Sequence, residues 1–374
     1  MAIRQPDIVR LWRAEFRHYS LSHAQRDLVA GLTVAAVALP LALAFGVAGG
    51  STPAAGLVTA IIAGLVIGLL SGAPYQISGA TGAMSAVLIV VADEYGPRGL
   101  WIAGLMAGVM ILAVGLFSLG RIINFIPAPV ITGFTSGIAL TIAIGQIDNY
   151  LGIKTPAHDR SSDKLIGYFT HALPPINWNA VISGGVVMAV MIIVPAVFAG
   201  AQRIPTALAG VALATALSWS LGWDVKTIGA IPRGIILDDR LTPRPSDIHL
   251  VSHLLAPAFA IALLGAIESL LCGVVAGRMT RQKLAVNQEL IAQGIGNILL
   301  PFFGGVPATA AIARTSVGVK AGGATRLVSI IHAIALLLGA MFFAGLIGHV
   351  PLAARGAGPQ RNPDPALRHR LANE

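Results

Sequence analysis

Charged residues are scarce in this sequence: lysine, arginine, aspartate and glutamate make up 11% of its 374 residues, whereas hydrophobic residues make up 55%. This balance excludes a soluble globular protein of ordinary composition. Cysteine is almost absent, and the single Cys272 lies inside an apolar run, so a disulfide framework is excluded as well. The sequence contains no nucleophile–base arrangement and no phosphate-hydrolysis motif. We therefore expect no enzyme, no cofactor and no metal site.

What the chain has instead is a series of apolar runs, many of them about 18 residues or longer, as membrane-spanning helices require. They predict an all-α polytopic membrane protein with about eleven spans. The formal net charge of +9 is dispersed over connections and chain ends, which fits membrane topology better than a nucleic-acid partner. The spans are expected near residues 27–48, 54–71, 75–92, 99–119, 127–151, 179–200, 205–222, 254–277, 287–302, 304–320 and 327–348.

The distribution of charge predicts an orientation. Residues 1–26 are rich in arginine and are expected to form an amphipathic cytoplasmic segment, not a cleaved signal peptide. With this end inside, short cytoplasmic connections hold basic residues such as Lys283 and Arg326, while the longer outer loops at 152–178 and 223–253 hold many of the aspartates. We expect a multi-pass protein of the bacterial inner (plasma) membrane, in contact with the lipid bilayer.

A weak internal echo indicates a duplication. Predicted spans one and eight are both long and rich in alanine, and each is followed by a second helix and then by a glycine-rich break. Because seven spans per repeat is an odd number, the two repeats are expected to be inverted relative to each other. We therefore expect a first repeat at 27–222, an outer loop at 223–253, an incomplete second repeat at 254–350 and a polar tail at 351–374.

The two breaks lie at corresponding places in the third and tenth spans, at residues 74–83 (PYQISGATGA) and 304–315 (GGVPATAAIART). A matched pair of broken spans is the sequence sign of a transport site near the membrane midplane. If helices restart there, their N-terminal N–H groups face one cavity and can bind an anion. Unwound backbone is tolerated at that depth only when it is buried in protein or lines a water-filled cavity. The alternative is a pair of glycine kinks in ordinary helices.

Two charged residues, Glu268 and Arg314, lie well inside the predicted spans. A charge at membrane depth is costly, so it marks a functional position by default. We expect Arg314 to attract an anion and Glu268 to take up and release a proton, because burial favours the neutral carboxyl and a nearby arginine favours the charged one. A permanent Glu268–Arg314 ion pair is the alternative. A polar stripe on span nine is expected to serve packing rather than a pathway, and comprises Asn287, Gln288, Glu289, Gln293 and Asn297.

Four motifs resemble those of the SulP (sulfate permease) anion transporters, the bacterial branch of solute carrier family 26. They are residues 27–40 (DLVAGLTVAAVALP), 77–82 (ISGATG), 304–309 (GGVPAT) and 313–315 (ART). The resemblance implies two inverted seven-span repeats, with a mobile core domain of spans one to four and eight to eleven and a gate domain of the others. It also implies an elevator-like motion of the core domain relative to the gate domain. The implied substrate is a small anion, such as sulfate, bicarbonate, chloride or a dicarboxylate, and a homodimer is possible.

Carried over by position, the resemblance implies a substrate cavity on spans one, three and ten, lined by Leu41, Phe45, Gly79, Ala80, Thr81, Ala311, Ile312, Ala313 and Arg314. Leu41 stands where many members have glutamine, and Ala80 where proline is usual. In the sodium-driven bicarbonate branch, the span-eight acid is aspartate, a threonine follows four residues later, and glycine replaces the arginine. Here these positions hold Glu268, Cys272 and Arg314, so proton coupling or uncoupled exchange is expected instead of sodium coupling.

The family pattern stops after Ala354, where a polar tail stands in place of spans twelve to fourteen and the usual cytoplasmic STAS domain. We therefore expect a truncated or frame-shifted product. The leading prediction is a secondary active anion transporter, proton-coupled or exchanging. The alternatives are an inactive membrane fragment of such a transporter, a nucleobase permease of the same general fold, and an anion channel.

Overall fold

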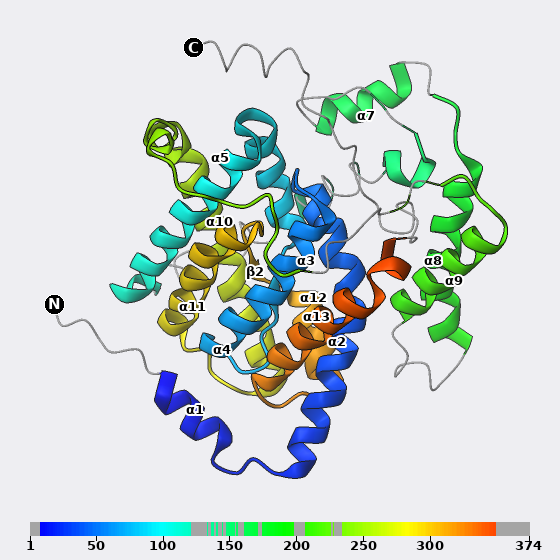
Figure 1. Cartoon of the computed structure of the whole chain (residues 1–374). Helices are drawn as coiled ribbons and strands as arrows, with labels where there is room; N and C mark the ends of the chain where they lie inside the picture. Colours follow the sequence, from blue (N-terminus) through cyan, green and yellow to red (C-terminus); the bar gives the residue numbers. More distant parts are fainter. Residues whose placement is uncertain are drawn as a thin grey trace.

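The structure is a computed structural model, and the residues that it describes lie mostly in helices (Figure 1). It describes residues 8–120, short stretches between 133 and 155, and residues 161–170, 174–197, 206–225, 227 and 234–348. Most of the predicted fifth span, 127–151, and the whole predicted tail, 351–374, lie outside these residues.

The elements follow one another in two series. The first consists of α1 (Ile8–Phe16), α2 (Leu21–Ala48), α3 (Pro53–Ile62), the π-helical turn η1 (Ala63–Ile67), α4 (Gly68–Leu70), β1 (Ser78–Gly79), α5 (Gly82–Leu116), α7 (Ser161–Thr170), α8 (Trp178–Val197) and α9 (Thr206–Ser220). The second consists of η4 (Pro245–Asp247), α10 (Ile248–Thr280), α11 (Val286–Leu299), η5 (Leu300–Phe303), β2 (Thr309–Ala310), α12 (Ile312–Lys320) and α13 (Leu327–Gly348).

Local sequence signals start and bend several helices. The side chains of Ser20, Thr52 and Thr81 each accept a hydrogen bond from the third residue of the following helix, which satisfies a backbone donor that has no partner inside the helix. Within α5, Gly96 has φ 69° and ψ −176°, and Pro97 follows it. The bend at Gly96 divides α5 into the third and fourth predicted spans.

Helices from the two halves of the chain pack against one another. α5 lies against α10 and α11, and α2 lies against α3 and α13. Gly64 and Gly68 allow α13 to approach the second span closely, because an added Cβ would lie 3.3 Å from the Ser329 carbonyl at Gly64 and would overlap the Ser329 side chain at Gly68. The two glycines therefore allow the helices to pack closely at this point. α8 and α9 pack on each other at one side of the molecule, where α9 also contacts α2 (Figure 1).

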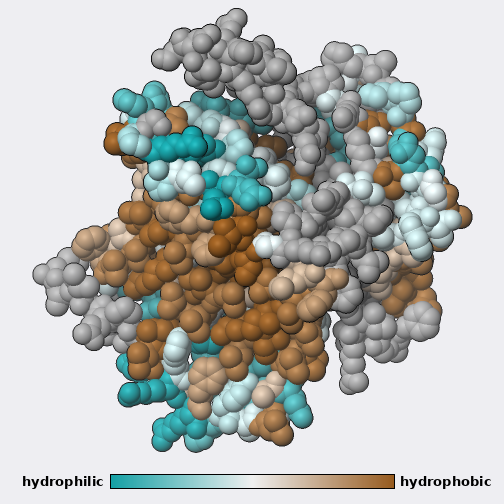
Figure 2. All heavy atoms as spheres, viewed as in Figure 1, coloured by the Kyte–Doolittle hydropathy of each residue, from teal (hydrophilic) through white to brown (hydrophobic). Residues whose placement is uncertain are grey.

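The surface carries a broad apolar band between two more polar ends (Figure 2). Among the described residues, four helices are long and apolar enough to cross a membrane: Leu21–Ala48, Pro53–Leu70, Gly82–Leu116 and Ile248–Thr280. Large apolar side chains such as Leu32, Val90 and Phe259 are exposed on them. Such a band is typical of a surface that faces lipid.

Several predicted boundaries differ from the structure. The outer loop expected at 152–178 contains the helix α7, and α10 begins at Ile248 instead of 254 because Pro245 and Asp247 start a helical turn there. The third predicted span begins as a helix only at Gly82, after the extended strand β1. Similarly, the tenth span becomes helical at Ile312, after β2.

Candidate functional site

The two predicted breaks meet in the structure. β1 and β2 pair as antiparallel strands, with Ser78 opposite Ala310 and Gly79 opposite Thr309, and all four residues are buried. The pairing is extended by hydrogen bonds from the Ala311 N–H to the Ile77 carbonyl (2.8 Å) and from the Ile77 N–H to the Thr315 hydroxyl (3.0 Å). The strand pair explains why neither segment is a simple glycine kink, because each break supplies backbone partners for the other.

A helix begins directly after each strand. Because the strands are antiparallel, α5 and α12 leave the pair in opposite directions, and both point their N-termini toward it. The first N–H groups of a helix have no partner within the helix and carry partial positive charge. The arrangement therefore brings two half-helix N-termini to one place, as the sequence predicted.

Arg314, in the first turn of α12, has a side chain that points back across the strand pair. It is 1% exposed, and its Nη2 donates a hydrogen bond to the Ala80 carbonyl (3.0 Å). A Cβ added to Gly79 would collide with Nη1, so glycine at this position leaves space for the guanidinium. The charge thus lies behind the first break, and the structure records no ion pair between Arg314 and Glu268.

Glu268, on α10, is half-buried and contacts the start of α5 instead. The Thr81 hydroxyl donates to Glu268 Oε2 (3.0 Å) and accepts from the Met84 N–H (3.3 Å), so one side chain both caps α5 and holds the carboxyl group. The neighbouring Ser269 hydroxyl is 3.0 Å from the Thr309 hydroxyl on β2. α10 therefore contacts both breaks through adjacent residues.

The other predicted cavity residues differ in exposure. Ile312 and Ala313 are exposed at the start of α12, and Ala311, the N-cap position, makes no side-chain hydrogen bond to the helix. Leu41 and Phe45 are partly exposed and four residues apart, so they share a face of α2. The Ser85 hydroxyl joins this face to α5 through a hydrogen bond to the Phe45 carbonyl (3.0 Å).

The polar stripe on α11 supports both breaks from behind. Gln293 Nε2 donates to the Ser78 hydroxyl (2.9 Å), and the Asn297 side chain bonds both the N–H (2.8 Å) and the carbonyl (2.9 Å) of Ala308. Glu289 is fully buried and accepts hydrogen bonds from Gly72 and Gln293, among others. The prediction that this stripe serves packing is confirmed.

The partners of the stripe were not predicted from the sequence, although the spacing of its residues indicates that they share one helix face. Positions 289, 293 and 297 repeat every four residues and so share one helix face. The role of Thr59 on α3 was also not predicted: its hydroxyl accepts from the Val306 N–H (2.8 Å) and so fixes the approach to β2. A single threonine in an apolar span has no sequence feature that distinguishes this role.

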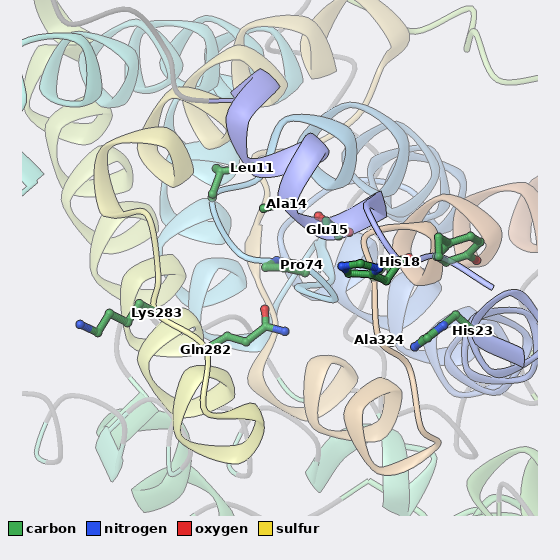
Figure 3. A pocket seen from close by; sticks show the side chains of 12 residues that line it. Leu11, Ala14, Glu15, His18, His23, Pro74, Gln282, Lys283 and Ala324 are labelled. Carbon is green, nitrogen blue, oxygen red and sulfur yellow. The ribbon is translucent and has the colours of Figure 1, made fainter.

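A cavity of about 480 Å³ lies elsewhere, between α1 and the loops at one end of the molecule (Figure 3). Its walls include His18, His23 and Lys283, and none of the predicted cavity residues lines it. α1 is fastened beside it by an ion pair between Glu15 and Arg326 (2.8 Å). The N-termini of α5 and α12 lie at the paired strands and do not line this cavity.

Comparisons with known proteins cover nearly the whole chain. The profile described as the sulfate permease family matches residues 25–357. The chain is 38% identical over 344 residues to the putative sulfate transporter YvdB of Bacillus subtilis, covering 91% of this chain and 64% of the relative. It is 33% identical over 345 residues to the bicarbonate transporter BicA of a Picosynechococcus species, covering 87% of this chain and 59% of the relative. The chain thus spans about three-fifths of the length of these relatives, which are transporters and not enzymes.

Solved structures agree. The transmembrane domain of a cyanobacterial BicA matches with a TM-score of 0.80 and 30% identity, over 90% of this chain and 87% of that domain. Murine Slc26a9 in an inward-facing state matches with a TM-score of 0.83 at 18% identity, over 94% of this chain and 61% of the other, which supports the fold alone. These matches confirm the predicted all-α polytopic membrane transporter fold. On the sequence profile, the relatives and the fold together, the chain belongs to the sulfate permease family, a family of membrane anion transporters.

Proposed function

We propose that this chain forms the transport domain of a secondary active carrier for a small anion, and that the anion binds between the N-termini of α5 and α12. The observation that supports this most is the pairing of β1 with β2, which brings two half-helix N-termini together beside a buried arginine. Relatives named as transporters of sulfate and of bicarbonate make these anions the first candidates, followed by dicarboxylates.

In this proposal the backbone of α12 contacts the anion directly. Ala311 offers no side-chain cap, so the N–H groups at the start of α12 remain available to a ligand. Arg314 contributes charge rather than contact, because its guanidinium is buried behind the strand pair and bonds the Ala80 carbonyl. A fixed charge acts strongly at this depth, since little water is present to screen it.

We further propose that Glu268 couples transport to protons or exchange. Its hydrogen bond with Thr81 ties its protonation to the capping of α5, so a change at the carboxyl alters one wall of the site. In the elevator-like step, helices α2 to α5 and α10 to α13 would move as one unit relative to α8 and α9. We also propose that the N-terminus is cytoplasmic and that the protein can form a homodimer.

The test is anion binding and uptake by the purified full chain in lipid vesicles, with sulfate, bicarbonate, succinate and uracil as separate ligands. We expect one of the anions to bind and be taken up, and Arg314→Ala to weaken its binding at least about tenfold, because the attraction of a nearby unit charge at the effective dielectric constant of a protein is about 2–4 kcal/mol. Arg278→Ala, which removes an exposed arginine at the end of α10, is the matched control and should retain affinity. Unchanged affinity in Arg314→Ala would contradict the proposal, and uptake of uracil alone would favour a nucleobase permease.

A further inference from the structure

Arg314 has a second buried neighbour that the proposed transport site does not use. His332, on α13, is fully buried, and its ring nitrogens make no hydrogen bond of normal geometry with any residue in the described part of the chain, although the Ser329 carbonyl lies close enough to interact with the ring. Nη1 of Arg314 likewise makes no such hydrogen bond, although Nη2 bonds the Ala80 carbonyl. Three polar atoms from two helices are therefore buried without a hydrogen bond of normal geometry to the described residues.

These atoms lie along one face of the second span. A Cβ on Gly64 would be 3.2 Å from His332 Nδ1, and a Cβ on Gly79 would meet Arg314 Nη1 while lying 3.4 Å from Ala60 Cα. Ala60 and Gly64 are four residues apart on α3 and η1, so they share a face and are separated by about 6 Å along the axis. The guanidinium and the imidazole therefore lie beside the same face of this span, one turn apart.

The backbone around His332 is closely packed. The Ser329 hydroxyl, one turn earlier on α13, donates to the Gly64 carbonyl (2.9 Å) and holds α13 against η1. α13 runs alongside α3 and η1 (Figure 1). η1 is a single π-helical turn, a feature that occurs frequently at functional sites. The Ser329 carbonyl can accept a hydrogen bond from one ring nitrogen at most, so the other ring nitrogen and Nη1 of Arg314 need a small polar occupant.

The chemistry of the two groups selects that occupant. The guanidinium only donates hydrogen bonds, whereas a neutral imidazole offers one donor and one acceptor. The neutral ring is favoured beside Arg314, because a second buried cation would be repelled. A water molecule can accept from Nη1 and donate to the free ring nitrogen, and buried waters typically make about three such bonds. Leaving the groups unpaired would cost about 1–3 kcal/mol for each.

We propose that Arg314 and His332 bind an ordered water molecule between them, and that His332 is a positioning residue for the arginine. The water holds the guanidinium against the Ala80 carbonyl, behind the N-termini of α5 and α12. Its effect on anion affinity rests on the proposed function, whereas the binding of water does not.

The first measurement detects the water directly. In the full chain labelled with ¹⁵N-histidine, the ring signal of His332, assigned by its loss in His332→Gln, should show a cross-peak with water. The cross-peak should weaken in Arg314→Ala, because one of the groups that orders the water is gone. A ring signal without water contact would overturn the proposal, and so would a water cross-peak that disappears when chloride is added, which would identify an anion as the occupant.

The second measurement tests positioning through sulfate binding. His332→Leu should weaken sulfate affinity about tenfold, and His332→Gln, which keeps a hydrogen-bonding group, should stay within about threefold of the original chain. In the Arg314→Ala background, His332→Leu should change affinity less than about twofold. Equal weakening by leucine and glutamine, or the same weakening without Arg314, would overturn the positioning role. If the unaltered chain binds none of the anions, the proposed function fails and the water cross-peak alone decides this inference.

Discussion

In the first break the residue before α5 is Thr81, whose hydroxyl caps α5 and holds Glu268, whereas in the second the residue before α12 is Ala311, which gives α12 no side-chain cap. The first break has no charged residue of its own, and the second carries Arg314. Yet the guanidinium bonds the carbonyl of Ala80 in the first break. The two breaks are therefore unequal in their chemistry, and each is completed by a residue from elsewhere.

This difference shows how two similar breaks can form a single site. At the first break, the Thr81 hydroxyl satisfies one of the first N–H groups of α5. The second leaves backbone N–H groups and the exposed Ile312 and Ala313 at its surface. We infer that the first break mainly fixes the geometry and that the second mainly meets the ligand.

The largest expected effect on stability comes from the support of the second break. Asn297→Leu removes an amide that bonds both the N–H and the carbonyl of Ala308, and it leaves both groups buried without a partner. We expect a loss of about 2–5 kcal/mol in the free energy of unfolding, measured by denaturation in detergent micelles. Gln288→Leu, which removes one hydrogen bond to the Leu70 carbonyl, is the control. Equal losses for the two variants would show that Asn297 has no special role.

The next effect concerns the contact between the breaks. In Gly79→Ala the new methyl group collides with Arg314 Nη1 and forces the guanidinium to move. We expect anion affinity to fall about five- to 150-fold, since overpacking costs about 1–3 kcal/mol, with the loss read by ligand titration. Gly339→Ala is the control, because a Cβ there meets nothing within 4 Å. Full affinity in Gly79→Ala would refute the placement of the arginine behind the first break.

Removing the cap of the first break should have a smaller effect. Thr81→Val keeps the shape of the side chain but loses the hydroxyl that bonds the Met84 N–H and Glu268. We expect about 1 kcal/mol less stability in thermal unfolding. Thr81→Ser, which keeps the hydroxyl, should behave nearly like the original chain, and a similar loss in both variants would count against the cap.

Adding a cap to the second break is the complementary change. Ala311 already has the extended backbone of an N-cap (φ −104°, ψ 110°), so Ala311→Ser can place a hydroxyl on the first N–H groups of α12. We expect slightly higher stability, by about 0.5–1 kcal/mol, together with weaker anion binding, because the hydroxyl competes for the same donors. Stronger binding in Ala311→Ser would argue that the ligand does not use these N–H groups.

The smallest effect is expected at the ion pair that joins α5 to η4. Arg98 forms two hydrogen bonds with Asp247 (2.7 and 2.8 Å) and lowers the pKa of that carboxyl. A lowered pKa stabilises the fold above the unfolded-state value and loses this contribution as pH falls through the folded-state value. We expect at most about 1 kcal/mol, because the pair is partly exposed. The difference between the melting temperatures at pH 7 and pH 3 should be smaller in Asp247→Asn than in the original chain, and an unchanged difference would contradict this assignment.

Much of the fold could be predicted because its signals are local. The run at 327–348 forms a helix over the predicted residues, and the glycine-rich breaks interrupt the third and tenth spans as expected. α7 was missed because its ten residues are too polar and too short to resemble a span. The start of α10 was misplaced because Pro245 and Asp247 begin the helix outside the apolar run.

The candidate site likewise has features that could be predicted from the sequence and features that could not. Glu268 and Arg314 could be selected from the sequence, since a charge inside an apolar span is conspicuous, but their partners could not. Glu268 bonds Thr81 and Arg314 bonds the Ala80 carbonyl, and neither contact follows from spacing along the chain. His332 was not selected at all, because a single histidine on an apolar helix does not indicate what lies opposite it.

The sequence by itself determined that the chain crosses a membrane, where its helices break, and which charges it places among them. These properties follow from composition and local backbone preference, which need no knowledge of distant residues. Only the tertiary structure decided that the breaks pair as strands and that the arginine lies behind them, because residues more than 200 positions apart meet there. The direction of one long side chain depends on the space that Gly79 and its neighbours leave, and that space exists only after the helices have packed.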